Sequence, residues 1–130
     1  NTINVAQVGA TEAMHQGMVQ KWFADYPWVI RIHPDVLIRK SSWILETMKD
    51  ESVDGIFVQC NADPWKIHGD FYAVRPTALP EDAFSEIVAE FKGMGNHEMT
   101  VAKEFKPIID SNRHRWLPGN DDSMGVCRVR

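Results

Sequence analysis

The sequence has no long apolar run, no closely spaced cysteines and no excess of positive charge. Without an apolar run of about 18 residues, no membrane-spanning helix is expected. The net charge of −4 gives no electrostatic basis for a nucleic-acid partner. Cys60 and Cys127 are far apart and lack C-x-x-C spacing, which favours two reduced thiols over a disulfide. Reduced thiols indicate a cytoplasmic location.

What is present is typical of an ordinary globular domain. The 130 residues include 44% hydrophobic and 25% charged side chains, so a single domain over 1–130 can bury a modest core. No internal repeat, low-complexity tract or linker divides the sequence. The chain begins with Asn1 in place of methionine, and we expect it to be a fragment of a longer protein.

The hydrophobic periodicity predicts alternating strands and helices. In chain order it predicts a strand at 3–8, a helix from 11 to about 25, a strand at 28–32, a helix from 41 or 42, a strand at 53–60, a loop at 61–65, a strand at 70–74, a helix at 80–92, a helix from 97 to about 106, and terminal extended segments at 115–119 and 125–130. This order predicts an α/β domain with a mostly parallel central sheet flanked by helices.

The first candidate site follows the buried strand at 28–32. In open α/β sheets, ligands bind beyond the carboxyl ends of the strands, and His33 and Asp35 come directly after this strand. The carboxylate of Asp35 can hold a hard divalent cation such as Mn²⁺ or Mg²⁺, and His33 can add a nitrogen ligand. Alternatively, Asp35 only ends the turn that begins at Pro34. The motif alone leaves both interpretations open.

The second candidate site surrounds the strand at 70–74. His68 and Asp70 repeat the His-x-Asp spacing, Gly69 allows a close approach of the backbone to a ligand, and Arg75 ends the strand. The alternative is a surface loop whose arginine pairs with a local carboxylate. Because Asp70 enters an otherwise apolar strand, the pattern favours a functional role.

The third candidate site is the tetrapeptide Gly95-Asn96-His97-Glu98, which resembles a metal-binding motif of binuclear metallophosphatases. His33-Pro34-Asp35 and Gly69-Asp70 precede it in the order which that family uses. However, the first motif is reversed, and the bridging carboxylate and the late Gly-His-x-His motif are absent. Without its bridging ligand, such a site cannot hold two ions about 4 Å apart. Glu98 is then either an acidic residue that stabilises the helix N-terminus through the helix dipole or a general base. A metallophosphoesterase remains the alternative function.

A second resemblance covers nearly the whole chain. The segments "GATEAMHQGM", "WVIRIHPDVLI", "GDFYAVRP", "NHEMTVAKEFKPIID" and "HRWLPG" follow one another in the order found in the GT-A nucleotide-sugar glycosyltransferases. More loosely, the chain resembles the members of this family from large algal viruses. The resemblance implies a Rossmann-like GT-A domain of which the first βα unit has no counterpart here.

The resemblance also implies a site. Asp35 matches the second acid of the family's Asp-x-Asp motif, which contacts the metal and the diphosphate, and His33 stands in place of the first acid. Arg75 and His68 would contact the donor, with Arg75 paired to the diphosphate or to Asp70.

The implied activity is a metal-dependent, hexosyltransferase-like reaction. Asp70 matches a contact to the donor sugar or the acceptor, and Glu98 matches the catalytic base. The implied cofactor is Mn²⁺ or Mg²⁺, and the implied partners are a UDP- or GDP-sugar and a glycan or other hydroxyl acceptor. A non-catalytic fragment is a further alternative.

Overall fold

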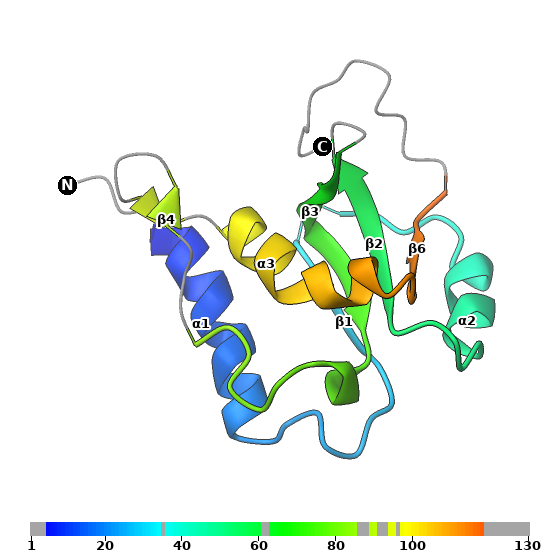
Figure 1. Cartoon of the computed structure of the whole chain (residues 1–130), viewed down its shortest axis with the longest axis horizontal. Helices are drawn as coiled ribbons and strands as arrows, with labels where there is room; N and C mark the ends of the chain where they lie inside the picture. Colours follow the sequence, from blue (N-terminus) through cyan, green and yellow to red (C-terminus); the bar gives the residue numbers. More distant parts are fainter. Residues whose placement is uncertain are drawn as a thin grey trace.

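A computed structural model describes residues 5–34, 36–60, 63–85, 89–90, 94–95 and 97–118 (Figure 1). Within these ranges, only the backbone is described for residues 5–8, 60, 63–66, 89–90, 94–95 and 97–99. In chain order the elements are α1 Val5–Val19, β1 Val29–Ile32, α2 Ser42–Met48, β2 Gly55–Cys60, β3 Asp63–Val74, the 3₁₀ helix η1 Pro76–Ala78, β4 Ala89–Glu90, β5 Met94–Gly95, α3 His97–Asp110 and β6 His114–Trp116. The strands predicted at 28–32 and 53–60 and the helices predicted from 41 or 42 and from 97 are confirmed.

The central sheet is mostly antiparallel. Its four strands have the order β1-β3-β2-β6, and β3 runs antiparallel to both β1 and β2. Only β2 and β6 form a parallel pair among the described strands. The predicted mostly parallel, Rossmann-like GT-A sheet is therefore wrong. The reason lies between Cys60 and Asp63, which are too close in sequence for the crossover that parallel neighbours require.

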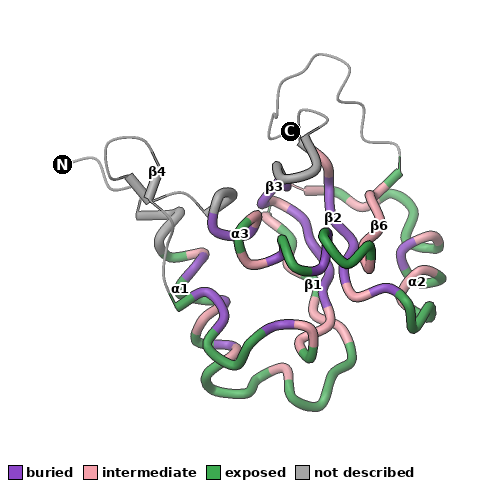
Figure 2. Tube along the Cα trace, viewed as in Figure 1, coloured by how far each residue is buried: buried purple, intermediate pink, exposed green. Residues whose placement is uncertain are grey.

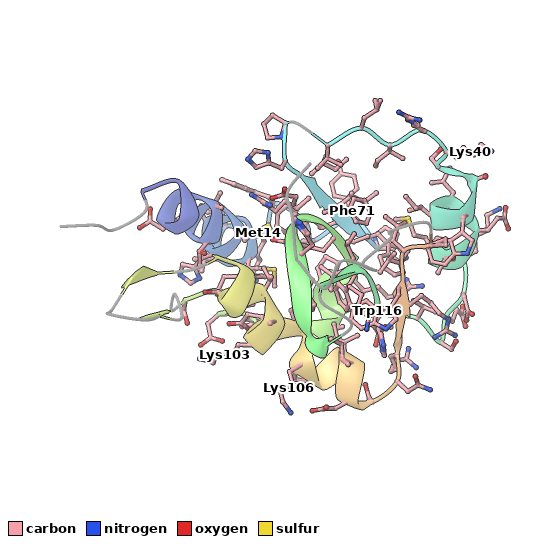
Figure 3. All side chains as sticks on the ribbon, turned by 90° about the horizontal axis from the view of Figure 1, so that it is seen from above. Met14, Lys40, Phe71, Lys103, Lys106 and Trp116 are labelled. Carbon is pink, nitrogen blue, oxygen red and sulfur yellow. The ribbon has the colours of Figure 1, made fainter. Side chains whose placement is uncertain are left out.

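Helices cover both faces of this sheet. One face packs against α1 and α3 through a cluster that includes Met14, Phe57, Tyr72 and Phe105. Phe105 stacks on Phe57, with 4.8 Å between the ring centroids, and meets Tyr72 edge-on at 5.0 Å. Figure 3 shows Lys103 and Lys106 of α3 pointing away from the sheet. The periodicity of α3 thus separates an apolar inner face from a charged outer face.

The other face of the sheet packs against α2. Its cluster is made of Ile44, Val53, Ile56, Val58, Phe71 and Ala73. Along β2, Ile56 and Val58 point to this face while Phe57 points to the α3 face, as expected for alternating side chains of a strand buried on both sides. The buried residues are concentrated in β2 and β3 (Figure 2).

The position of α1 shows that the strand predicted at 3–8 and the helix start predicted at 11 are wrong. This helix already begins at Val5, so Thr11 is a buried residue inside it and not its N-cap. It ends at Val19, where Lys21 takes a positive φ of 57° and Trp22 N–H bonds to the Gly17 carbonyl at 3.0 Å. This geometry is a Schellman motif, which stops the helix well before Asp25.

The helix predicted at 80–92 is also wrong within the described residues. Residues 81–84 form a turn in which Phe84 has a positive φ of 65°. Glu104 of α3 accepts a hydrogen bond from the Phe84 N–H at 3.1 Å, and His15 of α1 contacts the Ala83 carbonyl at 3.1 Å. These tertiary contacts hold the turn and bury Phe84 against the core. Elsewhere, the loop predicted at 61–65 gives way to β3 from Asp63, and α3 continues past Pro107 to Asp110.

Candidate functional site

Three strands of the central sheet end at the same edge. Because β1 and β2 both run antiparallel to β3, and β6 runs parallel to β2, the carboxyl ends of β1, β2 and β6 all point toward the beginning of β3, and β1 ends where Ile32 pairs with Phe71. His33 follows β1 at this edge, and its N–H donates to the Asp70 carbonyl of β3 at 2.8 Å. The sheet thus places His33 of the first candidate site next to Asp70 of the second.

One oxygen of the Asp70 carboxylate is enclosed and has no hydrogen-bond donor among the residues that the structure describes. Its side chain is 16% exposed and lies beside that of His68, which is 10% exposed. The distance of 3.9 Å between His68 Nδ1 and Asp70 Oδ2 is too long for a hydrogen bond. Oδ2 is buried and has no hydrogen-bond partner in the part of the chain that the structure describes. Since a buried acceptor left without a donor is costly, this atom is a candidate to receive a ligand hydroxyl.

Arg31 of β1 shares a face of the sheet with Asp70. The register pairs Arg31 with Tyr72, and Asp70 precedes Tyr72 by two positions, so the three side chains emerge on the same side. The guanidinium donates from Nη1 to the Gly69 carbonyl and lies 5.9 Å from the centroid of the Tyr72 ring. Burial raises the pKa of the Tyr72 hydroxyl, and the positive charge of Arg31 acts in the opposite direction. Tyr72 is therefore neutral at physiological pH.

Arg31 is not among the candidate residues that the sequence motifs indicate. Its one available signal is a single charged side chain in the otherwise apolar strand β1, the same signal that pointed to Asp70 in β3. A charge in such a position needs a partner, and strand register shows which charges share a face.

Arg75 lies at the opposite end of the sheet. It follows Val74, which pairs with Val29 and Gly55 at the beginnings of β1 and β2. At about 3.4 Å per residue, the strand carries Arg75 about 17 Å away from Asp70. The two residues therefore do not meet at one site.

The donors of Arg75 are engaged by the protein itself. Its Nε donates to the Val53 carbonyl at 2.8 Å, and its Nη2 lies 3.2 Å from both the Met48 and Asp50 carbonyls. Its guanidinium also lies 4.6 Å from the centroid of the Trp28 ring. These contacts join β3 to α2 and to the segment that precedes β2, which is a structural role.

The remaining predicted residues are described only in part. Asp35 and Asn96 lie outside the described residues. The backbone of His97 and Glu98 forms the first turn of α3, and their side chains are outside the description. The structure thus brings together His33, His68 and Asp70 and separates Arg75 from them.

The described residues do not fit a divalent metal ion. No group of three or more histidine, cysteine, aspartate or glutamate side chains among them could hold a metal. Mn²⁺ and Mg²⁺ prefer several oxygen ligands, whereas the described side chains of His33, His68 and Asp70 offer one carboxylate and two imidazoles. Within the same residues, no helix is both long enough and apolar enough to cross a membrane.

Comparison with known proteins identifies no relative, because no family model, curated protein or solved structure matches this chain.

Proposed function

We propose that this chain is a glycosyltransferase that transfers a sugar from a nucleotide-sugar donor to a hydroxyl acceptor, with Asp70 as a sugar contact. The observation that best supports the proposal is the buried Oδ2 of Asp70, which has no hydrogen-bond partner among the described residues. Sugar hydroxyls are hydrogen-bond donors, and hydrogen bonds to an ionised acceptor are the stronger ones. A hydroxyl bound there would satisfy an atom that the described part of the protein leaves unsatisfied.

The proposed reaction is a displacement at the anomeric carbon. The acceptor oxygen forms a bond to that carbon, the bond from the carbon to the phosphate oxygen breaks, and the hydroxyl proton passes to a base. Glu98 is the proposed base because it lies in the first turn of α3, the helix that packs on β3. Asp70 would hold the sugar in one orientation, which lowers the entropic cost of reaching the transition state.

The proposal includes partners and a compartment. The donor is a UDP- or GDP-sugar, the acceptor is a glycan or another hydroxyl compound, and the compartment is the cytoplasm. The dependence on Mn²⁺ or Mg²⁺, with Asp35 and His33 as ligands, remains a separate prediction because the described side chains do not form a metal site.

The test compares two aspartate variants in donor binding. Isothermal titration of a panel of UDP- and GDP-sugars, with and without Mn²⁺, should show binding to the wild-type chain. Asp70→Asn should weaken that binding by about 10- to 100-fold, the usual effect of losing a hydrogen bond to a charged group. Asp25→Asn is the matched control, because Asp25 is exposed in the turn region after α1.

Two results would overturn the proposal. One is equal donor affinity in Asp70→Asn and Asp25→Asn. The other is metal-dependent release of phosphate from an aryl phosphate without any binding of nucleotide-sugars, which would favour the metallophosphoesterase.

A further inference from the structure

We infer that Arg31 binds the phosphate groups of the donor at the edge where Asp70 binds the sugar. This inference rests on the proposed function and deepens it, since it assigns the anion contact that the sequence had given to Arg75. It also narrows the ligand to a compound that carries phosphate and sugar hydroxyls close together.

The guanidinium of Arg31 is anchored, and the described residues use only part of its donors. Nη1 donates to the Gly69 carbonyl, and the group lies beside the Tyr72 ring. No other hydrogen bond or ion pair of Arg31 is found among the residues the structure describes. The side chain is half-buried, so it is held in place and still reaches solvent. A fixed, planar guanidinium whose remaining N–H groups have no partner among the described residues suits bidentate binding of phosphate oxygens.

Other arginines of the described chain are committed to the protein. Arg113 donates to both carboxylate oxygens of Asp54, at 2.5 and 3.2 Å, and to the Glu51 carbonyl at 2.7 Å. Arg75 is engaged by three carbonyls, and Asp54 lies 3.7 Å from its Nε. Both lie at the end of the sheet where β2 begins, away from Asp70. Arg31 alone among these three shares the face of Asp70.

Arg31 and Asp70 complement a single ligand. They are diagonal neighbours on adjacent strands, which are typically about 7–8 Å apart, and no salt bridge within the described chain joins them. The cation is then available to phosphate and the carboxylate to hydroxyl hydrogens. A phosphorylated sugar presents both groups next to each other, whereas a free sugar lacks the anion and inorganic phosphate lacks the ring hydroxyls.

The experiment separates the anion contact from the sugar contact by using two probes. Inorganic pyrophosphate reports on Arg31, and the UDP- and GDP-sugar panel reports on the whole site, both by isothermal titration. Arg31→Gln should weaken the binding of pyrophosphate and of the nucleotide-sugars by about 10- to 100-fold, because a charge-assisted contact is lost. Arg39→Gln is the matched control, since Arg39 is exposed in the segment between β1 and α2. Asp70→Asn should weaken the binding of the nucleotide-sugars and leave the binding of pyrophosphate unaffected.

A second measurement uses the wild-type chain and does not depend on the folding of any variant. Modification of arginines by phenylglyoxal, mapped by mass spectrometry, should be slowed at Arg31 by pyrophosphate and unchanged at Arg39. Modification of Arg31 at the same rate with and without saturating ligand would overturn the inference.

The outcomes for Arg31 and for the proposed function are distinguishable. If nucleotide-sugars bind and depend on Asp70 but not on Arg31, the inference about Arg31 is wrong and the proposed function stands. If pyrophosphate binding depends on Arg31 while no nucleotide-sugar binds, the transferase is wrong and an anion site remains. If neither ligand binds the wild-type chain, both are wrong.

Discussion

Replacing Asp70 by asparagine should stabilise this protein while it weakens ligand binding. The side chain is 16% exposed, its Oδ2 has no hydrogen bond among the described residues, and His68 Nδ1 lies 3.9 Å from Oδ2. Leaving a buried polar group unsatisfied costs about 1–3 kcal/mol. Because the amide of asparagine carries no charge to be desolvated and can itself donate a hydrogen bond, while some exposure of the site remains, we expect a gain of about 1–2 kcal/mol from Asp70→Asn.

The gain can be converted to a melting temperature. For 130 residues at about 2.1 cal/mol/K per residue, the entropy of unfolding is about 0.27 kcal/mol/K. A gain of about 1–2 kcal/mol then raises Tm by about 4–7 °C. Asp25→Asn should shift the stability by less than about 0.5 kcal/mol, as is usual for exposed substitutions.

The assay is urea unfolding and thermal melting of both variants without ligand. An increase in stability for Asp70→Asn, together with weaker nucleotide-sugar binding, is the expected trade-off for a ligand-binding carboxylate. A loss of more than about 1 kcal/mol would show that the carboxylate makes stabilising contacts in the free protein, and the argument for Asp70 as a ligand contact would fail.

Two further predictions concern the core and the edge strand β6. Phe105→Ala should lower the free energy of unfolding by about 3–5 kcal/mol, because the ring is fully buried and packs against Phe57, Tyr72 and Phe84. A decrease of less than about 1 kcal/mol in urea unfolding would contradict the packing of α3 on the sheet. For His114, burial and then the charge of Arg115 lower the pKa in the folded state, so the unfolded state takes up the proton first and stability falls as the pH drops below about 6.5. His114→Gln should reduce this loss between pH 7 and pH 5 in thermal melts, and an unchanged pH dependence would exclude His114 as its source.

Individual strands were predictable from this sequence, but their direction was not recognised. The β-branched and aromatic residues of 28–32 and 53–60 identify β1 and β2 without ambiguity. The predicted parallel direction of the strand after β2 is wrong, since no helix separates Cys60 from Asp63 and only a hairpin-type, antiparallel connection is possible there. The short connection between Cys60 and Asp63 therefore predicts an antiparallel strand pair, whereas the alternation of strands and helices along the whole chain suggested a parallel sheet.

The incorrectly predicted elements failed for local and tertiary reasons. Val5 and Val8 are three positions apart, a spacing that suits one face of a helix as well as a short strand, so the pattern alone did not exclude α1. At 80–92 the apolar spacing is helical, yet the positive φ of Phe84 and the contact with Glu104 impose a turn. Contacts from residues this distant in sequence override local propensity and are not visible in a window of the chain.

The candidate site was partly predictable although the predicted sheet was wrong. The rule that ligands bind beyond the carboxyl ends of strands pointed to His33, and a charge in an apolar strand pointed to Asp70. Both arguments concern single strands, so they hold whether the neighbouring strand runs parallel or antiparallel. The antiparallel β3 has a consequence that a parallel strand would not have, because the residues that precede Phe71 in β3, including His68 and Asp70, lie at the end of the sheet where β1 ends. The same reversal carries the end of β3, and with it Arg75, to the opposite end of the sheet. Of Arg31, Arg75 and Arg113, only Arg31 shares the face of Asp70.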